Sequence, residues 1–316
     1  MAIKERKEEF ERKKENKVLE SAVLTFHGTE GFDVYNCSIP FTWEGKRYIY
    51  GRVEKRAEWA RSWVRLFEET GRDDYTLVPD HMIYQLEDPY ISILKGEMVM
   101  GGTHVRKRSG QVETYYGYFY RGTDLDDLIY FTTGPDYMKD IRLTELADGR
   151  IGVFSRPRNE EIEKKYGSGA MIGFAAISSL EELTDEVIES ARPIEGLFDK
   201  GEWGGCNQVY LLEDGNLGII GHQSYTQQRD GGDDLAVYVN IAFEFNPVTF
   251  EVKNKKIIGT RSCYPAGTAK KPNLIDCTFT SGIVMREDGR ADLYAGLGDT
   301  MEGRITIEYP FSAKLK

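Results

Sequence analysis

Four polar residues recur at the head of a repeated short strand, and their side chains could bind or transform a polar ligand. They are Asn36, Asp88, Asp140 and Asn207. Amide and carboxylate groups form several directed hydrogen bonds, and a carboxyl group can also transfer a proton. If these side chains meet, they favour recognition of a ligand with many hydroxyl groups, with acid or base catalysis at the same site.

The element that must position them is a hairpin that recurs five times along the chain. From each leading residue to the glycine at the turn there are 8 or 9 positions, and a fifth copy begins at Thr280. The leading residue advances by 52, 52, 67 and 73 positions from copy to copy. The turn glycines are Gly45, Gly96, Gly149, Gly215 and Gly289. A constant hairpin with variable connections is typical of the inner strands of propeller blades.

The sequence therefore predicts an all-β protein, a five-bladed β-propeller, with a sandwich or another all-β fold as the alternative. Because the inner strands of a propeller begin on one face, we expect the four leading residues to surround one funnel. The propeller is expected over residues 21–316, after a charged N-terminal helix or arm over residues 1–20. A second helical segment is expected from Ser179 to Ser190, which begins like a capped helix.

The composition excludes several classes of protein. With 41 Lys and Arg against 52 Asp and Glu, the net charge of −11 disfavours nucleic acid as a partner. No apolar run approaches the roughly 20 residues that span a bilayer, and the charged N-terminus does not resemble a secretory signal. The cysteines are far apart, and no HExxH motif occurs, so we expect no metal and no cofactor. A cytoplasmic protein with reduced thiols is the simplest interpretation.

Five short motifs, one in each predicted blade, resemble those of a known family. They are Gly51-Arg52-Val53-Glu54, Leu86-Glu87-Asp88-Pro89, Lys139-Asp140 with Ser155-Arg156-Pro157, Ile220-Gly221-His222, and Tyr294-Ala295-Gly296-Leu297-Gly298-Asp299-Thr300. In this order, over about residues 34–310, they resemble glycoside hydrolase family 130, the inverting mannoside phosphorylases and hydrolases. With Tyr35-Asn36 and Pro40-Phe41 added, the chain looks still more like an uncharacterised bacterial and trypanosomatid family of the same furanosidase-like superfamily.

The resemblance implies a carbohydrate-active enzyme, a glycosidase or glycoside phosphorylase, that cleaves a small oligosaccharide such as a β-mannoside with inversion. It implies that Asp88 is the general acid, which in the phosphorylases acts through a sugar hydroxyl. We expect no cofactor other than inorganic phosphate as a co-substrate, and a small saccharide as the partner, with no membrane partner and with a homo-oligomer left open. The residues predicted to bind substrate are Asn36, Arg52, Glu54, Glu87, Lys139, Asp140, Arg156, Trp203, Asn207, Gln208, His222 and Asp299.

The nucleophile is left open by the sequence. Lys139, Arg156 and His222 come from different blades and would together suit phosphate. Glu202 is instead a candidate base for water, and the family's second-blade arginine has no counterpart between Gly110 and Tyr116. A non-catalytic sugar-binding or regulatory propeller is the alternative function.

Each candidate also has a purely structural interpretation. Asp88 could cap the turn before Pro89, and Glu87 could be an exposed carboxylate at a strand edge. Arg52 and Glu54 lie two apart on one strand face and could pair to bridge blades. His222 could be a histidine at the edge of the core, Trp203 a packed loop residue, and Asp299 part of a turn.

Overall fold

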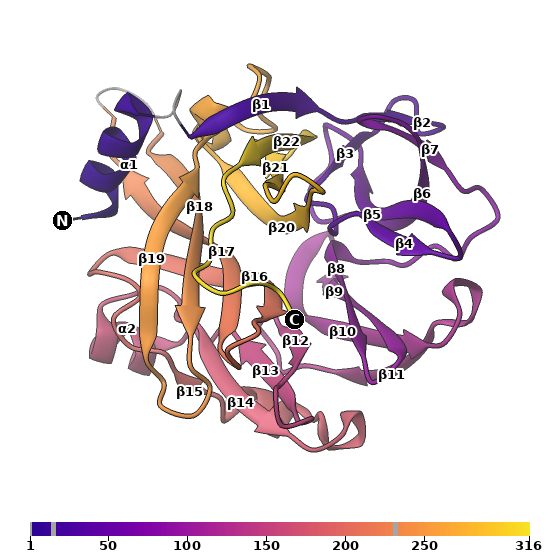
Figure 1. Cartoon of the computed structure of the whole chain (residues 1–316). Coiled ribbons are helices and arrows are strands. Elements are labelled where there is room, and N and C mark those ends of the chain that lie inside the picture. The colour runs from indigo at the N-terminus through magenta and orange to yellow at the C-terminus, as the bar shows by residue number, and fades with distance from the viewer. Residues whose placement is uncertain (1, 14–16, 230–232) are drawn as a thin grey trace. The chain divides into compact units, whose positions relative to one another are not determined.

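The computed structural model describes residues 2–13, 17–229 and 233–316. In these residues the strands form five sheets, and the arrangement is a five-bladed β-propeller with a short N-terminal helix, as the repeat predicts (Figure 1). The predicted fold class is therefore confirmed.

The five sheets follow one another along the chain. Blade 1 contains β2 (Thr25–His27), β3 (Asp33–Tyr35), β4 (Phe41–Trp43), β5 (Lys46–Glu54), β6 (Trp63–Gly71) and β7 (Asp74–Leu77). Blade 2 contains β8 (Glu87–Leu94), β9 (Glu97–Arg108), β10 (Gln111–Gly122) and β11 (Ile129–Thr133). Blade 3 contains β12 (Arg142–Glu145), β13 (Ile151–Ser155), β14 (Gly173–Ile177) and β15 (Arg192–Pro193).

The last two blades complete the fold. Blade 4 contains β16 (Glu202–Leu211), β17 (Leu217–Gln227), β18 (Leu235–Phe245) and β19 (Val252–Gly259). Blade 5 contains β20 (Thr278–Met285), β21 (Ala291–Leu297), β22 (Met301–Ile307) and β1 (Val18–Val23). Because β1 pairs antiparallel with β22, strands from the two ends of the chain share one sheet, in which β1 is an edge strand.

The five turn glycines confirm the hairpin repeat. Each has a φ between 80° and 84°, the left-handed region that glycine enters without a steric penalty. Three of the leading polar residues also lie in this region, with φ of 46° at Asn36, 51° at Asp88 and 59° at Asp140. Asn and Asp tolerate this conformation better than most residues. The repeated polar residue therefore marks a backbone kink in three of the five copies.

The kink divides the first strand of the first hairpin. A regular hairpin would have one strand from Tyr35 to Phe41, but β3 ends at Tyr35 and β4 begins at Phe41. The left-handed Asn36 cannot continue the extended ladder, and Pro40 has no N–H to donate to it.

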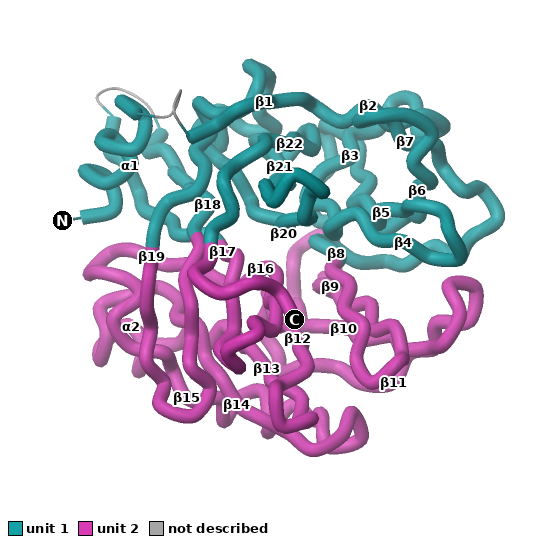
Figure 2. The backbone as a smooth tube through the Cα atoms, in the orientation of Figure 1, with its two compact units in different colours: residues 1–89, 222–241, 256–310 teal, residues 90–221, 242–255, 311–316 magenta. Residues whose placement is uncertain are grey.

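The chain divides into two compact units, each with its own hydrophobic core (Figure 2). Unit 1 comprises residues 1–89, 222–241 and 256–310, and unit 2 comprises residues 90–221, 242–255 and 311–316. The core of unit 1 includes Ile49, Phe67 and Tyr75, and the core of unit 2 includes Val99 and Phe119. Blades 1 and 5 belong to unit 1 and blade 3 to unit 2, whereas the strands of blades 2 and 4 are divided between them.

The N-terminal helix is shorter than predicted, and one of its faces is packed. The sequence predicts a charged helix or arm over residues 1–20, but α1 covers Ile3–Arg12 and β1 begins at Val18; residues 1 and 14–16 lie outside the described part. Ile3 and Phe10 are seven positions apart, so they share one helix face, and both are buried. Lys7 pairs with Asp276 at 2.9 Å, which fixes the helix to unit 1.

Two short helices lie in unit 2. The helical segment predicted from Ser179 to Ser190 is a single 3-10 turn at Leu180–Glu182 followed by α3 (Asp185–Glu189), which Thr184 caps. The second helix, α2 (Glu160–Tyr166), was not predicted from the sequence. Its signals were an N-terminal cap at Asn159 and a left-handed glycine after its last residue, both usual for helix ends.

The close approach of the backbone at Gly101 to the ring of Tyr90 gives a stability test. A Cβ added to Gly101 would lie 2.2 Å from the ring of Tyr90, whereas a Cβ at Gly169 would meet nothing nearer than 4.0 Å. We expect Gly101→Ala to lower the free energy of unfolding by about 1–3 kcal/mol because it overpacks the site. The matched Gly169→Ala should leave it unchanged or raise it by up to about 1 kcal/mol, as measured by urea unfolding. Equal effects of the two substitutions would contradict the packing of Tyr90.

Candidate active site

A buried arginine in unit 1 organises most of the predicted site residues of the first two blades. The guanidinium of Arg52, on β5, donates from Nη1 to Asp88 Oδ1 at 2.9 Å and from Nη2 to Glu87 Oε1 at 2.8 Å. Its Nε donates to Ser62 Oγ at 2.8 Å, and Nη2 lies 3.4 Å from Glu54 Oε2. One side chain therefore joins three carboxylates, two of them at the beginning of β8.

The charges in this cluster stabilise one another. Burial alone would lower the pKa of the Arg52 guanidinium, but the facing carboxylates, Glu87 first and also Asp88, hold that pKa well above its usual range. Glu87 is 9% exposed, so its interpretation as an exposed strand-edge carboxylate is wrong. The expected Arg52–Glu54 pair does form, and the same arginine also connects blade 1 to the first residues of blade 2.

Glu54 connects this cluster to a residue that the sequence analysis missed. The carboxylate of Glu54 forms an ion pair with Lys270 and accepts from the hydroxyl of Tyr35 at 2.5 Å and from the N–H of Arg61 at 2.8 Å. Burial would raise the pKa of Glu54, but Arg52 and these donors lower it. Lys270 lies in an irregular loop before blade 5, so no periodic pattern in the sequence indicated that it would reach blade 1.

Asn36 is the second residue that holds the carboxylate of Asp88. Its Nδ2 donates to Asp88 Oδ1 at 2.9 Å, so the leading residues of the first two hairpins meet directly. Two donors, Asn36 and Arg52, therefore converge on one oxygen of Asp88 and fix the orientation of its carboxylate. Asp299 is half-buried, has a φ of 57°, and interacts electrostatically with Arg52 and Tyr35.

In unit 2 the corresponding pair is Asp140 and Arg156. Arg156 Nη1 lies 3.0 Å from Asp140 Oδ2, and both side chains are buried. Arg156 Nε also donates to the carbonyl of Gly204 at 2.8 Å. The charge of Arg156 is thus partly balanced within unit 2, which the sequence analysis did not foresee. Lys139, next to Asp140, is half-buried.

A second arginine of unit 2, Arg142, was also missed. It packs over the ring of Tyr90 at 4.5 Å and donates from Nε to the carbonyl of Asn207 at 2.7 Å. Gln208 donates to the carbonyl of Ile91 at 3.1 Å, so residues of blades 2, 3 and 4 converge here. The available signal was position, since Arg142 lies two residues after Asp140 and Tyr90 two residues after Asp88.

Three further candidates, Glu202, Trp203 and His222, are buried or half-buried. The carboxylate of Glu202 is buried and accepts from the backbone N–H of Asp199 at 2.9 Å, within its own loop. Its neighbour Trp203 is half-buried. In unit 1, His222 is fully buried, with its ring 5.0 Å from that of Phe279 and 5.6 Å from that of Tyr238.

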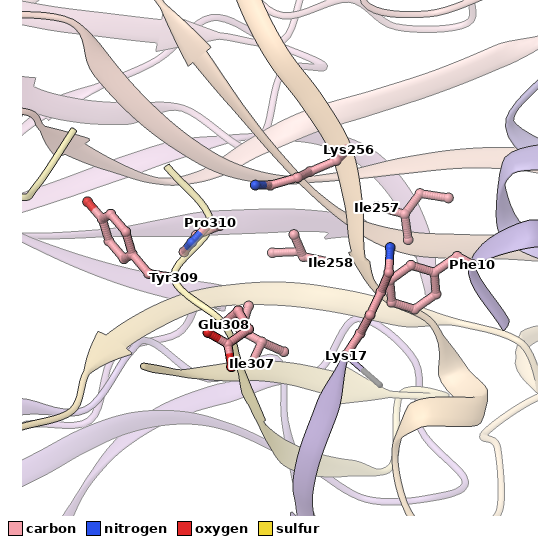
Figure 3. A pocket seen from close by; sticks show the side chains of 9 residues that line it. All are labelled: Phe10, Lys17, Lys256, Ile257, Ile258, Ile307, Glu308, Tyr309 and Pro310. Carbon is pink, nitrogen blue, oxygen red and sulfur yellow. The ribbon is translucent and has the colours of Figure 1, made fainter. Parts of the chain in front are cut away.

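Two cavities of unit 1 do not include these residues. One of about 250 Å³ is lined largely by apolar side chains, among them Phe10 of α1 and Ile258 of β19 (Figure 3). The other, of about 560 Å³, is lined by charged residues including Arg47 and Asp292.

Over residues 2–13, 17–229 and 233–316 no group of three or more His, Cys, Asp or Glu could hold a metal ion. In the same part of the chain, every helix is too short or too polar to cross a membrane.

Comparison with known proteins assigns this chain to a family. The chain belongs to the family described as protein of unknown function DUF1861, whose model matches residues 9–313. No curated protein matches the sequence significantly.

Several solved structures are similar to this chain. It is 53% identical to MPT-4, a mannose phosphorylase from Leishmania mexicana in complex with phosphate, with a TM-score of 0.93 over 99% of this chain and 96% of that one. It is 46% identical to MPT-1, a GDP-Man-dependent mannosyltransferase from the same organism, with a TM-score of 0.91 over 100% and 98% of the two chains. A putative glycosidase from Bacteroides thetaiotaomicron shares the fold, at 13% identity and a TM-score of 0.61 over 89% and 88%.

The arginine-centred cluster makes a prediction about stability. Replacing Arg52 with Met leaves buried carboxylates without their cation, and we expect the free energy of unfolding to fall by about 3–5 kcal/mol. Arg56 lies on the same segment and pairs with Asp33, but its side chain is 49% exposed, so Arg56→Met should cost less than about 1 kcal/mol. Guanidinium unfolding at neutral pH measures both. If Arg52→Met lowered the free energy of unfolding as little as Arg56→Met, the buried carboxylates would not depend on Arg52.

Proposed function

We propose that this protein is an inverting glycoside phosphorylase that cleaves a small mannoside with inorganic phosphate. The observation that carries the proposal is the 53% identity, over 99% of the chain, to a mannose phosphorylase in complex with phosphate. The enzyme class, the saccharide and phosphate as co-substrate rest on this similarity and on the motifs of the sequence. The buried free cysteines agree with the cytoplasm as the expected compartment.

The reaction assigns one role to Asp88. An oxygen of phosphate attacks the anomeric carbon, the glycosidic C–O bond breaks with inversion, and the departing oxygen receives a proton that originates from Asp88, by way of a sugar hydroxyl as in the phosphorylases that the chain resembles. The products are a sugar 1-phosphate and a saccharide shortened by one residue. Arg52 and Asn36 support this role because they hold the carboxylate of Asp88 in one orientation.

The charge of the unit 1 cluster agrees with a sugar as the substrate. The cluster has two cations, Arg52 and Lys270, against the carboxylates of Glu54, Glu87, Asp88 and Asp299. Such an acidic group suits a neutral sugar and a proton donor. Phosphate as the nucleophile is supported instead by the similarity to a phosphorylase in complex with phosphate.

Hydrolysis with Glu202 as the base is the less supported alternative. Its carboxylate already accepts a hydrogen bond from the backbone of its own loop, which agrees with a structural role. Transfer of mannose from GDP-mannose is a second candidate, because the chain is also 46% identical to MPT-1. A non-catalytic sugar-binding propeller remains the third.

The experiment is a screen of manno-oligosaccharides with and without phosphate, and with GDP-mannose, read by product chromatography. We expect a sugar 1-phosphate only when phosphate is present. We expect Asp88→Asn to reduce turnover roughly 10²–10⁴-fold while substrate still binds, because the proton donor is lost. Asp74, which is exposed and pairs with His27 in the same unit, provides the matched Asp74→Asn control with unchanged turnover.

Other products decide among the alternatives. Free mannose at the same rate without phosphate would favour hydrolysis, and products formed only from GDP-mannose would favour transfer. Saccharide binding without any product would contradict an enzymatic function.

A further inference from the structure

A fully buried carboxylate, Glu302, lies on β22 of blade 5 and is used by none of the steps above. Its Oε2 accepts from the backbone N–H of Cys37 at 3.0 Å, and its Oε1 accepts from Ser281 Oγ at 2.8 Å. One side chain of blade 5 therefore holds the backbone of blade 1 at Cys37, directly after Asn36, and all of these residues belong to unit 1.

The N–H of Cys37 directly follows the kink that places the Asn36 side chain. Asn36 has a φ of 46°, a conformation that is costly for a residue with a side chain unless its surroundings maintain it. Gly296 on the neighbouring β21 leaves room for it, since a Cβ there would lie 1.8 Å from Asn36 Oδ1. The amide placed in this way donates to Asp88 Oδ1 at 2.9 Å.

We propose that Glu302 is a positioning residue that holds the turn at Asn36 and Cys37, and through it the hydrogen bond from Asn36 to Asp88. Only the expected effect of Glu302 on turnover rests on the proposed function. The position of the turn itself is a property of the fold and can be tested without catalysis.

Glu302 also makes this positioning dependent on pH. Burial raises its pKa to about 8, although the hydrogen bonds from Cys37 and Ser281 partly offset this. The other titratable groups that face it are the thiol of Cys37 and the hydroxyl of Tyr264. An ionised carboxylate accepts hydrogen bonds more strongly than a neutral acid, so the turn is held more firmly as pH rises through this value.

Ionisation of Glu302 has the opposite effect on the free energy of unfolding, which falls as pH rises. The pKa of Glu302 is above its usual 4.5 in the folded protein, so the folded state binds more protons than the unfolded chain between about 4.5 and about 8. The stability contribution of this group is complete below the lower value and is lost as pH rises toward the upper one. Glu302→Gln, which is neutral at every pH, should remove this loss from the pH dependence of unfolding.

The test compares wild type with Glu302→Gln and with a matched control. Glu244 in unit 2 is also buried and accepts from the N–H and the hydroxyl of Ser312, but it belongs to no part of the proposed site, so Glu244→Gln is the control. We expect the ratio of wild-type to Glu302→Gln kcat to rise about fivefold from pH 6 to pH 9, with KM unchanged, because only the wild-type carboxylate ionises. The ratio of wild-type to Glu244→Gln kcat should stay the same from pH 6 to pH 9.

Amide hydrogen exchange of residues 34–40 provides the readout that needs no activity. At pH 9 this segment should exchange roughly tenfold faster in Glu302→Gln than in wild type, since weaker hydrogen bonds open more often. Equal exchange in the two proteins would overturn the proposal, whatever the enzyme does. Faster exchange in a protein that turns over no saccharide would uphold the positioning and contradict the proposed function instead.

Discussion

The burial of Arg52 is the constraint on which the described site depends. A guanidinium removed from water is costly unless carboxylates surround it, and Glu54, Glu87 and Asp88 do so. Because two of these acids begin β8, the requirement to pair the arginine also fixes where the second blade starts. The same interaction therefore joins two blades and orients the carboxylate that is proposed to move a proton.

Two hydrogen bonds of different kinds hold the carboxylate of Asp88. Arg52 approaches from β5 as a charged donor, and Asn36 approaches from a kink that blade 5 maintains through Glu302. The inner parts of three blades thus contribute to one carboxylate within unit 1. In unit 2, Asp140 and Arg156 form a smaller arrangement of the same kind, while Arg142 joins the beginning of blade 3 to the middle of β16 in blade 4.

The fold was predictable because its signal repeats. The turn glycines recur at a nearly constant distance from a polar residue, and backbone sterics allow few residues other than glycine at those φ values. The motifs around Arg52 and Asp88 were found through their resemblance to a known family, each within a copy of the repeated hairpin. Lys270 could not be found in this way, because a long loop carries it to Glu54 and no periodicity records that path. The kink at Asn36 was missed because strand alternation continues through it in the sequence, whereas the backbone does not.

The central claim is that Asp88 supplies the proton to the departing sugar oxygen, and leaving-group dependence tests it most directly. The measurement is the turnover of Asp88→Asn, relative to wild type, on a mannobioside and on a dinitrophenyl mannoside, both with phosphate. A nitrophenolate departs without a proton, so the account predicts a loss of roughly 10²-fold or more on the mannobioside and less than about tenfold on the activated substrate. An equal loss on both substrates would contradict the assignment of Asp88 as the general acid.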